Sequence, residues 1–235
     1  MSRRSSIRRA ANWFALACAA YLGLAYFAAP AFWTWRDRDR AADGPRMLTR
    51  TPQGIAGDPL NVGLVGNRAE VLRAFASAKW DTADALTLKS AVEIGESVLF
   101  DRPYPDAPVS PLLFEGRAQD LAFEKPLGNS ADQRHHVRFW RTREPADDGR
   151  PLWLGSASFD RGVGLSHDTG AVTHHIAPDI DAERDSLIDD FATAGMLAST
   201  HEIDGVGPTR TGRNGEGDAY FTDGKATIGI LKSVP

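Results

Sequence analysis

Cysteine is almost absent from this sequence, since Cys18 is the only one among 235 residues. A single cysteine excludes a disulfide framework, a cysteine-ligated zinc cluster and an iron–sulfur centre within the chain. Hydrophobic residues make up 42% and charged residues 25% of the chain, which excludes a disordered or collagen-like protein. The length is sufficient for one large domain or two small ones, each with a real core.

A net positive charge is also lacking beyond the N-terminus. Residues 1–35 contain four arginines and no acidic residue, and the whole chain has a formal net charge of −4, so the remaining 200 residues carry −8. A nucleic-acid-binding surface would be basic. The acidic body therefore argues against nucleic acid as a partner.

One long segment has no charge at all. The 23 residues from Trp13 to Trp35 would form a helix of roughly 34 Å, which is enough to cross a hydrocarbon core of about 30 Å. Tryptophans at both ends suit the two membrane interfaces. The alternatives are a buried core helix, which the basic start disfavours, and a cleaved signal peptide, whose best cleavage site contains Pro30. We therefore expect a basic segment over residues 1–12 and an uncleaved transmembrane anchor over residues 13–35.

The orientation of this anchor is nearly balanced by the positive-inside rule, with four arginines before it and five in residues 36–50. An N-terminal signal-anchor usually keeps its short basic end in the cytoplasm. This favours a body outside the cytoplasm.

The body is expected to have an α+β fold, mainly an antiparallel sheet packed against a few helices. Residues 36–58 are rich in charge, glycine and proline and indicate a tether, so the globular domain is expected over residues 59–232. Consecutive strands with helices at both ends favour an antiparallel sheet over a doubly wound parallel one. The expected strands are 60–65, 112–115, 120–125, 134–142, 152–159, 172–176, 196–203 and 228–231, and the expected helices begin after Asn67, near Thr87 and after Asp179 or Asp181.

Local signals mark the ends of several of these elements. Asn67 with Glu70 three residues later predicts a capping box, and Gly195 predicts the end of the last helix. Residues 167–170 predict a turn between two strands, and Asp223 followed by a glycine predicts a hairpin.

All six histidines lie between residues 135 and 201, and four of them form two doublets. Neighbouring side chains on a strand point to opposite faces of a sheet. This alternation places His136, with two arginines, and His175 on polar faces, whereas His135 and His174 fall on apolar faces. A three-stranded meander would bring His136 and His175 near each other.

These histidines are candidates for acid–base chemistry on an anionic substrate. Imidazole titrates near neutral pH, and a carboxylate and an arginine lie between the two doublets. The candidate catalytic residues are His136, His175, His167, Asp160 and Arg161. The alternative is that the histidines are ordinary core or hairpin residues.

The sequence gives weaker signals for metal binding, phosphate binding and nucleophilic catalysis, and it identifies no cofactor. His174, His175, Asp179 and Asp181 offer metal ligands, but the two acids also suit a helix N-terminus, so no metal site is expected. The glycine-rich loop 205–218 matches no phosphate-binding pattern and is expected to be a surface loop. No Gly-x-Ser-x-Gly motif is present, and two alternating serines look like ordinary strand residues.

Several separate strings, in one order along the chain, resemble the LssY C-terminal domain family. They are residues 117–126, 134–140, 159–167, 173–176, 179–184, 212–215 and 220–224, within a likeness that extends from about Pro59 to Leu231. The resemblance implies a domain of bacterial membrane proteins, often placed after a phosphatidic-acid-phosphatase-type membrane domain, and it implies no particular activity. The motifs of that phosphatase are absent from this sequence.

The sequence supports two functional hypotheses of different classes. One is a single-pass protein of the bacterial inner membrane, acting as a binding or accessory module of the cell envelope for a lipid, a glycan or another envelope protein. The alternative is a hydrolase-like enzyme acting on an anionic lipid or envelope substrate. The first is favoured because no complete catalytic signature is present, and the convergence of the five candidate side chains would distinguish them.

Overall fold

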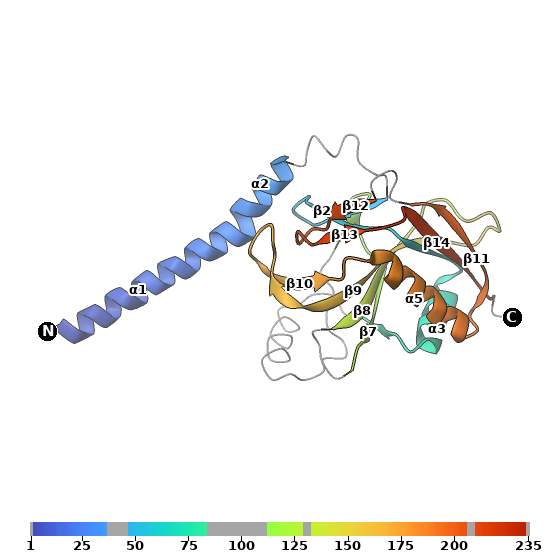
Figure 1. Ribbon diagram of the computed structural model, residues 1–235, viewed down its shortest axis with the longest axis horizontal. Coiled ribbons are helices and arrows are strands. Elements are labelled where there is room, and N and C mark those ends of the chain that lie inside the picture. The colour runs from blue at the N-terminus through green and yellow to red at the C-terminus, as the bar shows by residue number, and fades with distance from the viewer. Residues whose placement is uncertain (1, 37–46, 84–111, 129–132, 206–209, 234–235) are drawn as a thin grey trace.

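The uncharged segment forms most of a long N-terminal helix that projects away from the body in the computed structural model, which describes residues 2–36, 47–83, 112–128, 133–205 and 210–233 (Figure 1). The helix consists of α1 (Ser2–Gly23), the π-helical turn η1 (Leu24–Ala28) and α2 (Ala29–Arg36). Its stretch from Ser6 to Arg36 is long and apolar enough to cross a membrane.

The π-helical turn has a local cause in Pro30. Proline lacks an N–H and its ring clashes with the carbonyl group four residues earlier in a regular helix. Directly before it, the Ala29 N–H donates to the Leu24 carbonyl five residues back, which widens the helix at this point.

The body is built on an eight-stranded sheet. Its strand order is β11-β14-β3-β9-β8-β7-β4, with β10 added on β9, and every neighbouring pair is antiparallel except β14 and β3. The α+β prediction is confirmed. The strands are β3 (Val62–Val65), β4 (Asp81–Thr82), β7 (Leu121–Pro126), β8 (Arg134–Arg141), β9 (Leu152–Leu165), β10 (Val172–Ile176), β11 (Leu197–Asp204) and β14 (Lys225–Leu231).

Two small sheets accompany the main one. The first has the order β2-β1-β5-β6, from β1 (Leu48–Arg50), β2 (Ala56–Pro59), β5 (Leu113–Phe114) and β6 (Arg117–Ala118), and the second pairs β12 (Thr211–Arg213) with β13 (Ala219–Phe221). Strand β1 and all but the last residue of β2 lie within residues 36–58, which we expected to be a tether. Ordered structure therefore begins earlier than the lack of periodicity indicated, because short strands in a small sheet leave little pattern.

One face of the main sheet forms the hydrophobic core. Helices α3 (Arg68–Ser77) and α5 (Ile180–Thr193) contribute to this core, in which Phe75 is fully buried. The Phe75 ring stacks on Phe123 with centroids 3.6 Å apart and meets the Phe191 ring edge-on at 4.8 Å. Both predicted caps are present, since Asn67 and Glu70 form a capping box and the Asp179 carboxylate accepts from the Ala182 N–H.

The opposite face of the same strands is polar and equally buried. Glu124 is paired with His136, and His136 with Ser158, so cross-strand neighbours share this face. The buried polar side chains on it are Glu124, Arg134, His136, Arg138, Ser156, Ser158 and Asp160.

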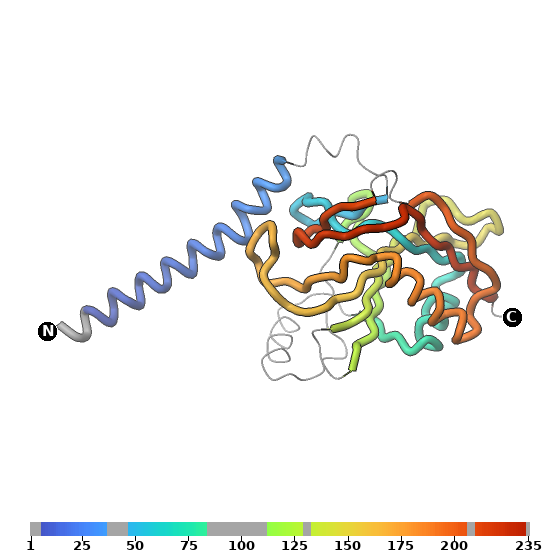
Figure 2. Tube along the Cα trace, viewed as in Figure 1, coloured from blue at the N-terminus to red at the C-terminus, as the bar shows by residue number. Residues whose placement is uncertain are grey.

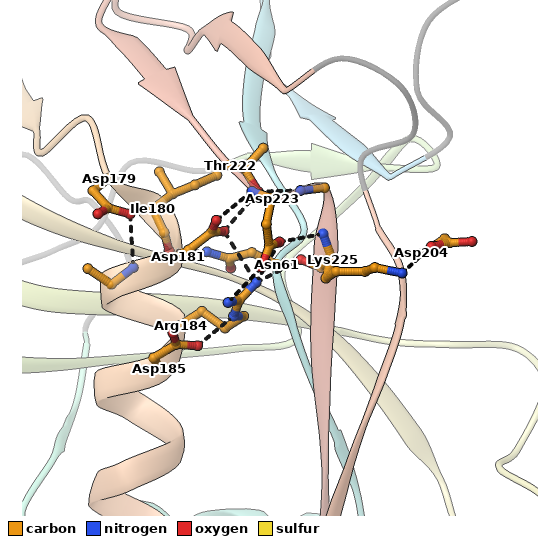
Figure 3. Close-up of polar contacts among 12 residues, drawn as sticks. Asn61, Asp179, Ile180, Asp181, Arg184, Asp185, Asp204, Thr222, Asp223 and Lys225 are labelled. Atoms are coloured by element: carbon orange, nitrogen blue, oxygen red, sulfur yellow. Dashed lines mark hydrogen bonds and ion pairs between the residues drawn. The ribbon is translucent and has the colours of Figure 1, made fainter.

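The N-terminus of α5 is tied to the turn before β14, as Figure 3 shows. Arg184 lies within 2.7 Å of Asp185 and 3.0 Å of Asp223, while Asp181 accepts from the Thr222 hydroxyl at 2.8 Å. Buried Asn61 donates to the Ile180 carbonyl at 2.8 Å. This part of the family-like sequence therefore has a structural role.

Some predicted elements differ from the structure. Strand β9 continues six residues beyond Phe159, because β10 pairs with its second half. The turn at Asp223 does not form a hairpin, since β13 pairs with β12 whereas β14 pairs with β11 and β3. The helix expected near Thr87 lies outside the described residues.

Candidate functional site

The polar face of the main sheet borders a cavity of about 50 Å³. Its lining residues come mainly from strands β2, β8, β9 and β10 and from the loop before β13. Its lining residues are Asp58, Leu112, Arg134, His136, Arg138, Asp160, Thr173, His174, Ile176, Asn214, Gly215 and Glu216. The cavity thus gathers segments that are far apart in the sequence.

Arg134 is the centre of a buried ion network. Its Nε lies 2.9 Å from Oδ2 of Asp160, and its Nη1 lies 2.6 Å from Oε2 of Glu124. Burial alone would lower the pKa of Arg134, but the two carboxylates outweigh it and raise that pKa above its ordinary value. The guanidinium group is therefore held in its charged form.

His136 is held between a guanidinium group and a carboxylate. Nη1 of Arg138 lies 3.0 Å from Nε2 of His136, and because arginine can only donate, Nε2 must accept. The ring proton is thus assigned to Nδ1, which lies 3.2 Å from Oδ1 of Asp160. The two ring nitrogens of His136 thus face charged neighbours on opposite sides, Arg138 and Asp160.

The pKa values of Asp160 and Arg138 are shifted, and these contacts explain the direction of each shift. Burial would raise the pKa of Asp160, but His136 and Arg134 outweigh it and hold that pKa well below its ordinary value. Burial lowers the pKa of Arg138, which has Asp58 only 3.4 Å away as a partial compensation.

The charge balance of the cavity is acidic. Three carboxylates line it, from Asp58, Asp160 and Glu216, against the two guanidinium groups of Arg134 and Arg138. Burial raises the pKa of Glu216, and the nearby Asp58 carboxylate acts in the same direction. An anionic group in the cavity would meet three carboxylates, which oppose the attraction of the two guanidinium groups.

A second polar cluster lies on the other side of β10. His175 Nδ1 lies 2.7 Å from Oδ1 of Asp218, and His167 Nε2 lies 3.4 Å from the same oxygen. The centroids of the two imidazole rings are 4.9 Å apart.

The five candidate residues from the sequence are divided between these places. His136 and Asp160 contact each other in the cavity, and His167 and His175 contact Asp218 in the second cluster. Arg161 is exposed on β9 and is not among the lining residues of the cavity. The structure therefore does not bring the five together around one cleft.

The cavity histidine on β10 is His174, not His175. His174 and Ile176 line the cavity together, as the alternation of faces indicated, so the error lay in taking their side of β10 as the apolar one. The alternation along β8 did indicate that Arg134 and Arg138 share the face of His136. Asp58 and Asp218 had no comparable signal, because distant loops and strands carry them to the site.

The fold and the site together define an α+β domain with a buried polar cavity, preceded by a helix able to cross a membrane. The family model described as LssY C-terminus matches residues 42–226, which is most of the chain. The chain therefore belongs to the LssY C-terminus family, as its sequence strings indicated. No curated protein and no solved structure matches the chain.

Proposed function

We propose that this protein is a membrane-anchored binding module of the bacterial cell envelope, and that its cavity receives a hydroxyl-rich group such as the sugar of a membrane glycolipid. The observation that carries the proposal is the buried network of Arg134, His136, Arg138 and Asp160 beside a cavity.

Such a network is costly for the fold alone. Each buried ion loses several kcal/mol of hydration, and apolar side chains of similar volume often give equal or greater stability. The chain nevertheless buries at least six ionisable or hydroxyl side chains on this face. A binding role accounts for their retention, because buried donors and acceptors fix the orientation of a ligand.

The chemistry of the lining points to a hydroxylated ligand. A sugar hydroxyl both donates and accepts, so it can donate to a carboxylate and accept from a guanidinium group within the same cavity. A free phosphate only adds negative charge to the three carboxylates present. A cavity of about 50 Å³ suits one substituent of a ring or a small headgroup, not a whole lipid.

In this proposal, the N-terminal helix is the membrane anchor and the cavity lies close to the membrane. Figure 2 shows the β9–β10 hairpin beside that helix. Trp33, at the end of the helix nearest the body, donates from Nε1 to the Asp168 carbonyl at 2.7 Å. Because β10 also lines the cavity, a ligand anchored in the same membrane fits this arrangement. We place the domain outside the cytoplasm, on a single-pass anchor in the inner membrane.

The test uses the full-length protein in detergent micelles and titrates a dihexosyl diacylglycerol by isothermal titration calorimetry. We expect saturable binding that falls at least tenfold in Asp58→Asn, which removes one lining carboxylate charge. Asp204→Asn, at an exposed acid on β11, is the matched control. Phosphatidic acid, titrated in parallel, should not bind the cavity. Equal affinities in the two variants, or preferential binding of phosphatidic acid that Asp58→Asn alters, would reject the proposal.

A further inference from the structure

Two histidines and an aspartate lie together where the β9–β10 hairpin meets the loop before β13. His167 comes from the turn of the hairpin, His175 from β10, and Asp218 from the residue before β13. One potential ligand atom from each lies within 4.8 Å of the others. Neutral imidazole nitrogens and a carboxylate oxygen are the donors that Zn²⁺ accepts in proteins outside cysteine sites.

The carboxylate of this cluster is fixed in position by the backbone. Asp218 is almost fully buried, and its Oδ2 accepts from the Ile176 N–H at 3.0 Å. The Asp218 N–H donates to Oδ1 of Asn214 at 2.9 Å. These two bonds hold the other carboxylate oxygen of Asp218, Oδ1, toward both imidazole rings. Contacts of this kind orient ligands in metal sites.

The imidazole rings are positioned as well. A Cβ at Gly164 would lie 2.5 Å from Nε2 of His175, so the ring occupies space that only a glycine leaves open. The backbone N–H of His167 donates to the Glu216 carbonyl at 2.9 Å, and the Ser166 hydroxyl donates to the same oxygen at 3.0 Å. The turn that carries His167 is therefore attached to the loop that carries Asp218.

We propose that His167, His175 and Asp218 form a binding site for a divalent transition-metal ion of the zinc class. The side chain of His167 is 57% exposed, so the site keeps a position open to solvent. Three protein ligands and one open position are typical of catalytic zinc sites rather than structural ones, which are closed by four protein ligands. This assignment replaces the expectation that the chain has no metal site, and it does not rest on the glycolipid proposal.

The metal would also affect the cavity. Asn214, Gly215 and Glu216 line the cavity, and Asp218 follows them in the same loop. An ion that joins Asp218 to the hairpin would fix this loop against the hairpin.

The experiment measures Zn²⁺ binding to the full-length protein in detergent micelles, expressed without a histidine tag and stripped of metal with a chelator. Competition with a fluorescent zinc indicator gives the stoichiometry and Kd. We expect one Zn²⁺ per chain, with affinity reduced at least tenfold in His167→Ala. This variant is chosen because an exposed side chain can be removed with little effect on folding, whereas Asp218 supports the backbone.

The matched control is His201→Ala, which removes an exposed histidine on β11. It should bind Zn²⁺ as the wild type does. As a second readout, Co²⁺ should give the visible absorption of a low-coordinate site in the wild type and lose it in His167→Ala. The inference is overturned if the wild type binds no stoichiometric Zn²⁺, if His167→Ala binds it unchanged, or if His201→Ala loses affinity equally. Glycolipid titration of the same samples reports separately on the proposed function.

Discussion

The two faces of the main sheet are buried to a similar degree but are chemically opposite. One face packs phenylalanines such as Phe75, Phe123 and Phe191 against two helices, whereas the other holds Arg134, His136 and Asp160 beside a cavity. Apolar contacts on the first face stabilise the fold directly through the hydrophobic effect. The ions on the second face stabilise it little in net terms, because desolvation offsets their attraction. The contrast assigns stability to one side of the sheet and the proposed binding to the other.

The largest expected effect on the apolar face is at Phe75. Phe75→Ala should reduce the free energy of unfolding by about 3–5 kcal/mol, because it leaves a cavity among stacked rings. Urea denaturation followed by fluorescence measures this loss. Leu127→Ala, at a half-exposed position, should change stability by less than about 0.5 kcal/mol. Similar losses for both variants would contradict the assignment of the core.

On the polar face, the charge of Arg134 matters more than its volume. Arg134→Met should reduce the free energy of unfolding by about 3–5 kcal/mol, because it leaves Glu124 and Asp160 buried without their shared cation. Arg134→Lys keeps the charge and should cost less, although it loses the forked geometry. Equal costs in the same denaturation experiment would show that packing, not charge, governs this face.

The pH dependence of stability should separate the faces further. The pKa of Asp160 is depressed in the folded protein, so its stabilising contribution is complete above the unfolded value of about 3.9 and is lost as the pH falls toward the folded pKa. Asp160→Asn should therefore flatten the fall in stability between about pH 4 and pH 2, measured by urea midpoints. Asp147→Asn, at an exposed acid, should leave the fall unchanged.

The smallest expected effect concerns a buried hydroxyl group. Oγ of Ser158 has no hydrogen-bond partner among the described residues. Ser158→Ala should leave stability unchanged or raise it by about 1 kcal/mol, because it removes an unsatisfied polar group. Ser199→Ala, on the exposed strand β11, is the control. A clear loss of stability in Ser158→Ala would show that this hydroxyl is satisfied in the folded protein.

The sequence predicted this fold better than the site. The alternation along β8 indicated both the face of Phe139 and the face of His136, because a strand between two neighbours keeps its period. On β10 the alternation correctly grouped His174 with Ile176, but the apolar neighbours Val172 and Ile176 led to the wrong face being taken as polar. The metal cluster needs Asp218, which lies 43 residues from His175, so only the three-dimensional fold brings it there.

Contacts between the helix and the β9–β10 hairpin set the reach of the domain. A hydrogen bond from Trp33 to the hairpin turn joins the body to the end of the proposed anchor, in addition to the chain connection. On that proposed anchor, the domain would sample a narrow layer next to the bilayer instead of a hemisphere swept by a free linker. Its effective concentration is therefore highest for ligands that diffuse within the plane of the membrane, and encounter becomes a two-dimensional search.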